Sequence, residues 1–238
     1  MTGGRYHRQI PLIGAEGQER LADATVSIIG AGGLGSPVST YLALAGVGEL
    51  IIIDDDEISP SNLNRQFLHA SADIGKKKAC SAWRTLHALN PDVTITALPC
   101  RVTSGTVSAC IHDADIIVDA SDNYETRFLL NRAALSGRIP LVHGAVSGCS
   151  GQMTTIIPGK TPCLSCIIPH PSSAGQTPII GAAAGVIGSL QALEVIKYLT
   201  GAGNLIAGRL LIWDGMTGKT DFFQISARKD CPECGHLR

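Results

Sequence analysis

A glycine-rich turn between two apolar segments constrains the fold of this chain more than any other feature. The first segment, Thr25 to Gly30, is short and apolar, as expected of a buried strand. The turn G-A-G-G-L-G runs from Gly30 to Gly35, and a helical pattern over 38–45 then leads to a second apolar run over 50–53. A strand, a glycine turn, a helix and a strand in this order predict a βαβ unit with parallel strands.

The same alternation continues along the chain. Ser36 and Pro37 predict the cap and the first residue of the helix after the turn. Further helices are expected over 76–89, 126–136 and 186–199, and further strands over 93–97, 116–119, 141–143, 152–157, 210–213 and 222–225. The last two strands flank a glycine-containing turn and are typical of a hairpin. We predict one α/β domain over 1–238, with a doubly wound, mostly parallel Rossmann-like sheet extended by C-terminal antiparallel strands.

Composition and charge narrow the classes of partner and compartment. The chain has 238 residues and a formal net charge of −1, so no global attraction to nucleic acid or to an anionic membrane is expected. The N-terminal residues are polar, which predicts no signal peptide. No run approaches the ~20 uninterrupted apolar residues that span a bilayer. We therefore predict a cytoplasmic protein with neither a membrane nor a nucleic acid as its partner.

The glycine turn is suited to binding a nucleotide. It contains four glycines that we expect at the phosphates, namely Gly30, Gly32, Gly33 and Gly35. Such a turn lets backbone N–H groups approach phosphate oxygens at a helix N-terminus. Asp54 lies about 20 residues further on, where a carboxylate can accept from a ribose hydroxyl, and Asp56 is a second candidate. The alternative is a tight turn between strand and helix that binds no ligand.

Polar and basic residues after Asp54 favour ATP over NAD, a distinction that the turn itself does not make. Asn62, Arg65 and Gln66 follow the second strand, and Lys78 comes after them. An extended row of cations suits a triphosphate, because negative charge moves between its phosphates during the reaction. A dinucleotide's bridging pyrophosphate needs fewer cations. The alternative, solvated basic residues at the start of a helix, explains Arg65 poorly because that residue lies in a polar stretch at the expected crevice.

A second acidic segment follows the predicted strand at 116–119. Its residues include Asp122 and Asn123, and carboxyl ends of parallel strands form the crevice in which ligands bind. An aspartate in this place can hold Mg²⁺ against phosphates. Equally, Asp122 or Asn123 can serve as the N-cap of the next helix. The residues alone leave both interpretations open.

Four of the eight cysteines form two C-x-x-C pairs, namely Cys163, Cys166, Cys231 and Cys234. In a reducing compartment they are better interpreted as metal ligands than as disulfides. Four thiolates complete a closed tetrahedral zinc site, and a closed site has no open position for catalysis. We predict a structural Zn²⁺ that ties the C-terminal tail to the long loop over 158–181. His170 and His236 are close enough in sequence to compete as ligands.

Several motifs occur in order from Arg5 to Cys234. They are R-Y-x-R-Q from Arg5, G-Q-E-R-L from Gly17, G-A-G-G-L-G-S-P from Gly30, S-N-L-N-R-Q from Ser61, D-x-S-D-N-x-x-T-R from Asp119, G-S-L-Q-A-L-E-V-I-K from Gly188 and the paired C-x-x-C motifs. This set resembles the ThiF/MoeB/HesA family, which is related to the ubiquitin-activating enzymes. S-N-L-x-R-Q together with two distant C-x-x-C pairs is a specific combination.

The resemblance implies an adenylyltransferase that uses ATP and Mg²⁺ to activate the C-terminal Gly-Gly carboxylate of a small ubiquitin-like sulfur carrier. It implies that the turn and Asp54 hold the nucleotide and that Asn62, Arg65 and Lys78 face the phosphates. It further implies that Asp122 binds Mg²⁺ and is essential. Arg8 resembles an arginine that reaches the neighbouring subunit's active site, which implies a homodimer. Residues 1–145 would form the nucleotide-binding half, and 146–238 the carrier-binding and zinc-binding half.

One position departs from the family pattern. Relatives that handle sulfur or form a thioester often carry a cysteine in the loop before the last long helix, and ungapped alignment places Ala174 there. We therefore predict adenylation without covalent capture of the carrier on this loop. Which carrier is used, in thiamine, molybdopterin or nitrogenase-related synthesis, stays open.

Three other functions compete with this interpretation. An NAD-dependent oxidoreductase would use the same glycine turn with His143 as its acid/base residue, although a core histidine is the simpler account of His143. A non-catalytic scaffold would bind the ubiquitin-like tail, but it would not need Arg65, Lys78 and Asp122 together. A family relative could instead adenylate another carboxylate or a tRNA base, which the near-neutral charge disfavours.

Overall fold

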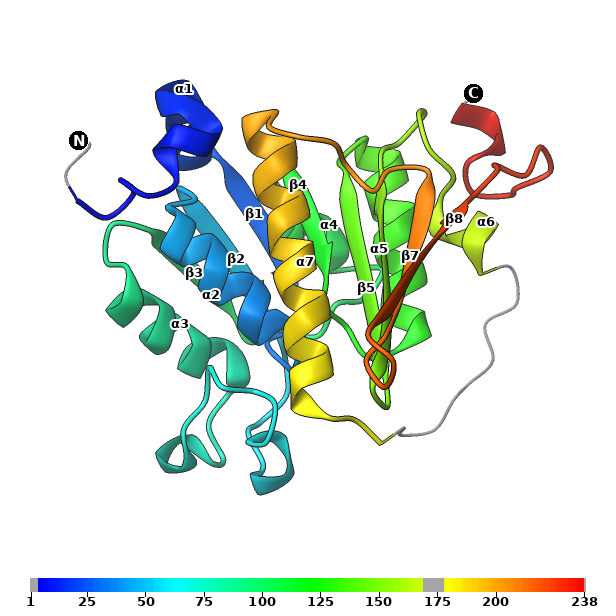
Figure 1. The fold of residues 1–238 in the computed structure, drawn as a ribbon. Coiled ribbons are helices and arrows are strands. Elements are labelled where there is room, and N and C mark those ends of the chain that lie inside the picture. The colour runs from blue at the N-terminus through cyan, green and yellow to red at the C-terminus, as the bar shows by residue number, and fades with distance from the viewer. Residues whose placement is uncertain (1–3, 169–177, 238) are drawn as a thin grey trace.

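Eight strands form a single sheet in the order β3-β2-β1-β4-β5-β6-β7-β8 (Figure 1). The computed structural model describes residues 4–168 and 178–237. The strands are β1 (Thr25–Ile29), β2 (Glu49–Ile53), β3 (Thr94–Leu98), β4 (Ile116–Asp119), β5 (Leu141–Ser147), β6 (Ser150–Ile156), β7 (Arg209–Asp214) and β8 (Lys219–Gln224). The first five pair in parallel and the last three antiparallel. The predicted fold class is confirmed, including the C-terminal hairpin of β7 and β8.

Helices cover both faces of the sheet. One face carries α1 (Ile10–Asp23), α2 (Gly35–Ala45), α3 (Lys78–Leu89) and α7 (Gly181–Thr200), and the other carries α4 (Val107–Cys110), α5 (Tyr124–Gly137) and α6 (Leu164–Ile167). Short 3-10 turns span Pro60–Asn62, Ser71–Asp73 and Gly235–Leu237. Alternate residues of β1 and β2 therefore enter two separate hydrophobic cores, one on each face. This double burial explains why those strands appear as continuous apolar runs.

The chain reverses its direction across the sheet beside β1. It moves from β1 outward to β2 and β3, and then returns to place β4 on the other side of β1. At such a switch point the loops after neighbouring strands diverge and leave a crevice beyond their carboxyl ends. The glycine turn follows β1 and lies at that crevice.

Two local expectations need correction. Helix α2 begins at Gly35, one residue before the predicted cap Ser36, and its N-cap is Leu34 without a side-chain hydrogen bond. The Ser36 hydroxyl instead donates back to the Gly32 carbonyl at 2.8 Å. Helix α1 had no counterpart among the predicted elements because Pro11 and Gly14 interrupt its pattern, and Gly14 kinks it with a φ of 77°.

Helix α7 is the one helix within residues 4–168 and 178–237 that has the length and hydropathy of a membrane span. It packs against α1 and α2 and against β5 and β6, and its Glu194 is buried. That Glu194 carboxylate accepts from the Thr155 hydroxyl at 2.6 Å and from the Ile206 N–H at 2.8 Å. We conclude that α7 is a core helix of the α/β domain.

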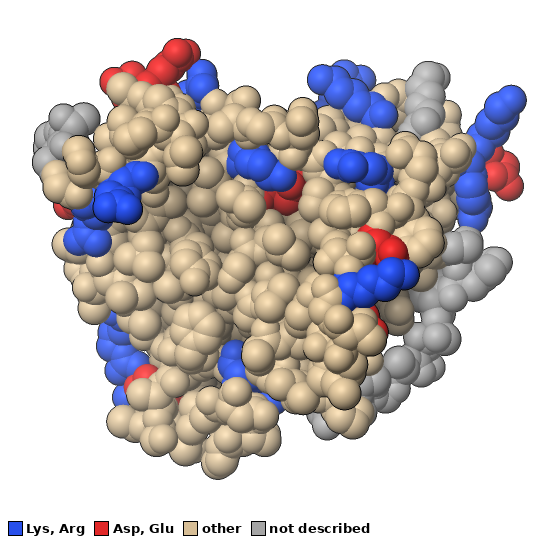
Figure 2. All heavy atoms as spheres, viewed as in Figure 1, with Lys and Arg blue, Asp and Glu red and all other residues tan. Residues whose placement is uncertain are grey.

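The outer surface of α2 and α7 is apolar. Figure 2 shows few charged side chains over the middle of this face, which is seen from the same side as in Figure 1. A groove of about 570 Å³ runs between the two helices and is lined by Tyr41, Phe67, Val186, Leu190 and Leu193 among others. Tyr41, Phe67 and Leu193 are each at least half exposed.

Candidate functional site

A cavity of about 250 Å³ opens at the carboxyl ends of β1, β2, β3 and β4. Its lining includes Gly30 after β1, the acidic run Asp54 to Asp56 after β2, and Ser121 to Asn123 after β4. These are the segments that the sequence predicts at the crevice of a doubly wound sheet. The structure therefore brings the glycine turn, the ribose candidate Asp54 and the metal candidate Asp122 together around one space.

Two glycines of the turn are required by the backbone. Gly30 has a φ of 105°, and a Cβ there would lie 2.5 Å from the Ala120 carbonyl oxygen. A Cβ on Gly35 would collide with the Gly30 carbonyl. Helix α2 has no side-chain N-cap hydrogen bond, so no cap occupies the backbone N–H groups at its start. This open helix N-terminus is suited to an anionic ligand.

Asp54 is held against the glycine turn before any ligand binds. Its Oδ2 accepts the Ala31 N–H at 2.8 Å and its Oδ1 accepts the Asp56 N–H at 2.9 Å. Burial raises the pKa of Asp54, whereas the Lys78 ammonium and the two backbone N–H groups act in the opposite direction. A carboxylate has room for further donors beyond these two, and a ribose hydroxyl is one of the donors that it can accept.

Two cations lie near the turn, and in the part of the chain that the structure describes only one of them forms an ion pair with a carboxylate. Lys78 is buried, and its Nζ lies 2.7 Å from Oδ2 of the exposed Asp56. Arg65 packs its Cγ and Cδ beside Gly33, about 3.5 Å from where a Cβ would stand. Its Nη1 donates to the Ser61 carbonyl and to the Asn64 side chain, each at 2.9 Å. Across the described residues no carboxylate forms an ion pair with Arg65, so its charge is available for a phosphate.

The loop that carries Arg65 forms a wall behind the glycine turn. Asn62 ends a 3-10 turn and its Oδ1 accepts the Ser59 N–H at 3.0 Å. Gln66 is buried, and its Nε2 would be 3.4 Å from a Cβ on Gly32. His69 is also buried, and its Nε2 donates to the Ala31 carbonyl at 3.0 Å. Gln66 and His69 thus fix the shape of the turn, while Asn62 fixes the loop.

Asp122 is exposed at the cavity, and the structure separates its two candidate roles. The cap of α5 is Asn123, whose Oδ1 accepts the Thr126 N–H at 2.9 Å. Asp122 accepts one hydrogen bond of 3.3 Å from the Asn123 amide. Its carboxylate is therefore not used as a cap. An exposed carboxylate at a cavity that also holds Asp54 offers the hard oxygen ligands that Mg²⁺ prefers.

A buried hydrogen-bond network lies under Asp122. Asp119 ends β4 and is fully buried, and its Oδ2 lies 2.7 Å from Nδ1 of His143 on β5. Burial acts to raise the pKa of Asp119, but the hydrogen bond from His143 and the Arg127 guanidinium hold that pKa below its usual value. His143 is fully buried as well, so it is a core histidine and does not reach the cavity.

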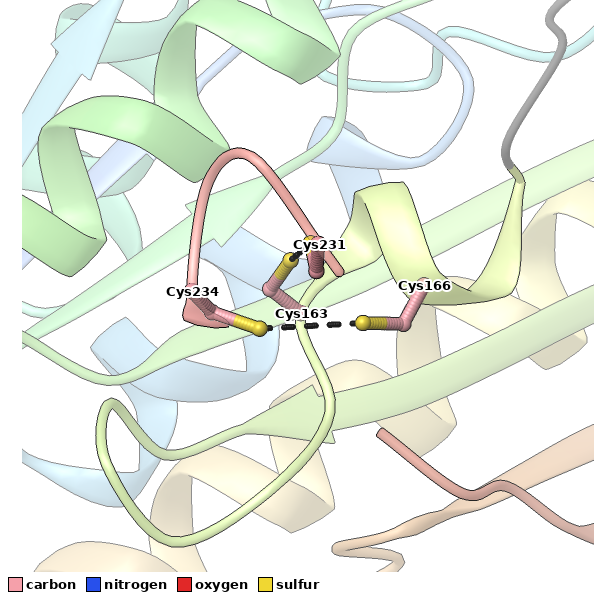
Figure 3. A group of neighbouring side chains, drawn as sticks. All are labelled: Cys163, Cys166, Cys231 and Cys234. Atoms are coloured by element: carbon pink, nitrogen blue, oxygen red, sulfur yellow. Dashed lines mark hydrogen bonds between the residues drawn. The ribbon is translucent and has the colours of Figure 1, made fainter. Parts of the chain in front are cut away.

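The four paired cysteines converge on one another, two from the segment at α6 and two from the C-terminal tail (Figure 3). The Sγ atoms of Cys163 and Cys231 are 3.6 Å apart, as are those of Cys166 and Cys234, and all four lie within 4.8 Å of one another. Zinc–sulfur bonds of about 2.3 Å in a tetrahedron place sulfurs about 3.8 Å apart, so this set fits a zinc ion. His170 lies outside the described residues.

The structure does not bring Arg8 to the cavity of its own chain. Arg8 is exposed, and its neighbour Gln9 donates from Nε2 to the Ala45 carbonyl at 2.8 Å. The Tyr6 ring lies against Gly46, the residue that ends α2. Helix α2 has 11 residues and is about 16 Å long, with the glycine turn at its far end. Arg8 is therefore anchored at the end of α2 that lies away from the turn.

The basic cavity residue Arg101 was not anticipated from the sequence. Arg101 lies in the loop after β3, lines the cavity and has an exposed side chain. The signal that could have found it is the carboxyl-end rule, since β3 is also a parallel strand. Ala174, where relatives often carry a cysteine, lies outside the described residues.

Comparisons with known proteins agree with this geometry. The model of the ThiF family matches residues 6–234. A SAMP-activating enzyme E1 of Haloferax volcanii is 41% identical over 239 residues, covering 97% of this chain and 88% of that protein. A sulfur carrier protein adenylyltransferase of Thermus thermophilus is 42% identical over 246 residues, covering 97% and 90%.

The structural comparison gives the same family of folds. E. coli MccB, solved with AMPCPP and MccA, superposes with a TM-score of 0.90 at 25% identity, covering 98% of this chain and 75% of that one. The family match spans nearly the whole chain, and both named relatives exceed 40% identity over 97% of it. The chain therefore belongs to the ThiF family.

Proposed function

We propose that this chain is an ATP-dependent adenylyltransferase that activates the C-terminal Gly-Gly carboxylate of a small ubiquitin-like sulfur carrier and releases pyrophosphate. The observation that carries the proposal is the convergence of Gly30, Asp54 and Asp122 on one cavity. Lys78 pairs with Asp56 of that lining, and Arg65 lies beside Gly33 of the turn. The names of the Thermus and Haloferax relatives describe an adenylyltransferase for sulfur carriers and an activating enzyme.

Different residues would bind different parts of the nucleotide. The N–H groups of the turn would hold phosphate oxygens, and Asp54 would accept from the ribose. Asp56 would hold Lys78 in place, and Lys78 and Arg65 would stabilise the negative charge that grows on the leaving pyrophosphate. Asn62 would position the loop that carries Arg65, and Gln66 would pack against Gly32 of the turn.

The reaction asks little acid–base chemistry of the protein. A carboxylate oxygen of the carrier attacks the α-phosphorus, the new acyl–phosphate bond forms, and the bond to the β-phosphate oxygen breaks. The carrier carboxylate is already ionised at neutral pH, so no side chain has to take a proton from it. Mg²⁺, when bound through Asp122, would neutralise charge on the phosphates.

The cysteine cluster would hold a structural zinc ion. Four thiolates fill a tetrahedral site, so no ligand position is left for a substrate. Cys163 begins α6 and Cys231 belongs to the C-terminal tail, so the ion would join two segments that are 68 residues apart. The Leu164 N–H beside the cluster donates to Asn131 of α5 at 2.9 Å, which attaches it to the core.

We further propose that the active species is a homodimer in which Arg8 reaches the partner's cavity. The support is that Arg8 is anchored at the distal end of α2 and that an apolar groove of about 570 Å³ lies on α2 and α7. An arginine that does not serve its own site can serve the site of a second copy across that face. The partner copy would stabilise developing phosphate charge as an arginine supplied in trans.

Complementation tests the dimer. Arg8→Ala and Asp122→Ala would each lose pyrophosphate exchange alone. In a mixed dimer one of the two sites has an intact Asp122 and faces an intact Arg8, so an equal mixture should recover roughly a quarter of wild-type activity. Recovery that does not rise above the sum of the two variants would contradict an arginine supplied in trans.

The experiment that tests the proposed function is ATP–pyrophosphate exchange with candidate Gly-Gly-tailed carriers. Exchange should depend on the carrier and disappear when its terminal glycine is removed, because the attacking carboxylate then lies out of reach. Absence of exchange with every Gly-Gly carrier would overturn the substrate class. If NAD⁺ and not ATP protects the protein from thermal unfolding, the result would favour a dehydrogenase. The structure offers little support for that alternative, because its candidate acid–base residue His143 is buried away from the cavity.

A further inference from the structure

The proposed chemistry leaves one buried polar group unused, directly beneath Asp122. It consists of Asp119, Ser121, Arg127 and His143. Asp119 and His143 are both 0% exposed, so neither touches a ligand in the cavity. Replacing a buried charged group by apolar side chains often costs nothing or stabilises a protein, so general stability gives no reason to retain this pair.

Hydrogen bonds within this group hold Ser121, the residue before Asp122, through both its N–H and its carbonyl. Oδ1 of Asp119 accepts the Ser121 N–H at 3.1 Å and the Ser121 hydroxyl at 2.6 Å. Nη2 of Arg127 donates to the Ser121 carbonyl at 3.0 Å. The residue after Asp122 is held as well, since Asn123 caps α5. Asp122 is thus presented to the cavity by a backbone that is tied before and after it.

His143 determines how the Asp119 carboxylate is turned. The two residues are directly paired in the register of β4 and β5, and His143 Nδ1 lies 2.7 Å from Asp119 Oδ2. An ionised carboxylate only accepts, so Nδ1 must carry the hydrogen. This bond occupies Oδ2 and leaves Oδ1 facing Ser121. Nε2 of His143 is buried and has no partner among the described residues, so Nδ1 alone gives this side chain its polar role.

We propose that His143 is a positioning residue for the metal ligand Asp122, acting through Asp119 and Ser121. The inference rests on the proposed role of Asp122 in binding Mg²⁺. Without the Nδ1–H donor, Oδ2 of Asp119 keeps only the Arg127 guanidinium, whose Nε lies 4.0 Å away with no hydrogen bond. Asp119 can then turn toward Arg127, loosen its hold on Ser121 and let the Asp122 carboxylate move from its place at the cavity. A fixed carboxylate loses less freedom on binding a cation than a mobile one does, so metal affinity depends on the buried donor.

Two variants of nearly equal size, His143→Asn and His143→Leu, separate the effect of the hydrogen-bond donor from that of side-chain volume. Asparagine places Nδ2 as many bonds from Cβ as Nδ1 of histidine, whereas leucine places a methyl group there. Mn²⁺ would be titrated into the protein with α,β-methylene ATP, and the bound ion followed by electron paramagnetic resonance. His143→Leu should raise the dissociation constant of Mn²⁺ about tenfold, and His143→Asn should stay within about twofold of wild type. In an Asp122→Ala background the two variants should not differ, because the coupling runs through Asp122.

If His143→Leu does not fold, His143→Val serves in its place, since valine suits a strand and has no hydrogen-bond donor. Equal Mn²⁺ affinity in wild type and a folded donor-free variant would overturn the inference. So would equal weakening by asparagine and leucine, or an undiminished difference without Asp122. Loss of pyrophosphate exchange with every carrier, together with the expected Mn²⁺ pattern, would reject the proposed function and leave the positioning role intact.

Discussion

The nucleotide cavity and the cysteine cluster are both assembled from distant segments, but they are held in different ways. At the cavity, two of the side chains that we expect to bind ATP already have protein partners. Asp54 accepts two backbone N–H groups, and Lys78 pairs with Asp56. In the cluster, the thiols contact mainly one another at 3.6 Å. Burial also raises the pKa of the Cys163 thiol, which opposes the thiolate form.

This difference indicates which region depends on its ligand for structure. Asp54 and Lys78 at the cavity already have protein partners, so the proposed ligands ATP and Mg²⁺ would need little rearrangement there. Four thiolates in close contact repel one another unless a cation lies between them, so the proposed zinc ion would complete the cluster. Changes at the cavity should therefore affect chemistry without unfolding, and changes in the cluster should affect structure more than chemistry.

The largest effect is expected at Asp122. Asp122→Asn should lower pyrophosphate exchange by at least about 10²-fold, since an amide is a far weaker Mg²⁺ ligand than a carboxylate. The melting temperature should stay within about 2 °C of wild type, because the side chain is exposed and makes one weak hydrogen bond. Exchange kinetics and calorimetry measure the two quantities.

Glu19→Gln is the control for that variant, because Glu19 is an exposed acid on α1 and is not part of the cavity lining. It should leave exchange nearly unchanged. Near-normal exchange by Asp122→Asn would place the metal on the Asp54–Asp56 run instead, whose carboxylates also lie within 4.8 Å of one another.

Much of the fold could be predicted because its signals are local. Strands buried on both faces appear as continuous apolar runs, and β2, with three isoleucines before Asp54, is the clearest. Helix α1 could not be predicted this way, since Pro11 and the kink at Gly14 break its period. The start of α2 was misplaced because Ser36 matched a cap by residue type, while its hydroxyl in fact bonds backward to Gly32.

Site residues that belong to a short sequence motif could be predicted. Those whose role depends on how two strands are aligned could not. Asp54, Asp122 and the paired cysteines stand in short patterns with fixed spacing. The pairing of His143 with Asp119 depends on the alignment of β4 with β5, which no local pattern encodes. Arg101 was missed for a similar reason, because its relevance depends on β3 being parallel to its neighbour.

An intermediate effect is expected in the cysteine cluster. Cys163→Ser should reduce bound zinc from about one ion per chain to nearly none, because the buried site loses a thiolate. The tail around Cys231 should then be cleaved first in limited proteolysis, and the melting temperature should fall by several degrees. Affinity for ATP should change less than about threefold.

Cys149→Ser is the control for the cluster, since Cys149 is a partly buried thiol outside it. It should keep both the zinc and the protease resistance. A zinc-free Cys163→Ser protein that also loses ATP binding would contradict the separation of the two regions, because the cavity would then depend on the metal.

The smallest effect is expected at Asp73, which ties the turn Ser71–Asp73 to α3 without any metal. Asp73 accepts hydrogen bonds from Lys76 at 3.0 Å and from Arg84 at 2.5 Å. Although its burial acts in the opposite direction, these bonds hold the pKa of Asp73 well below its ordinary value of 3.8. Asp73→Asn should therefore lower the free energy of unfolding by about 1–2 kcal/mol at pH 7, since both cations are half exposed and partly screened.

The lowered pKa of Asp73 determines how its contribution to the free energy of unfolding changes with pH. A carboxylate whose pKa is lowered on folding stabilises the protein above its unfolded pKa, and this stabilisation is lost as the pH falls toward the folded pKa. The difference between wild type and Asp73→Asn in urea unfolding should be constant above about pH 5 and should shrink as the pH falls below 3.8. Asp92→Asn, at an exposed position, should show no such difference. A difference that persists unchanged at low pH would mean that the shape of the Asp73 side chain, and not its charge, holds this turn against α3.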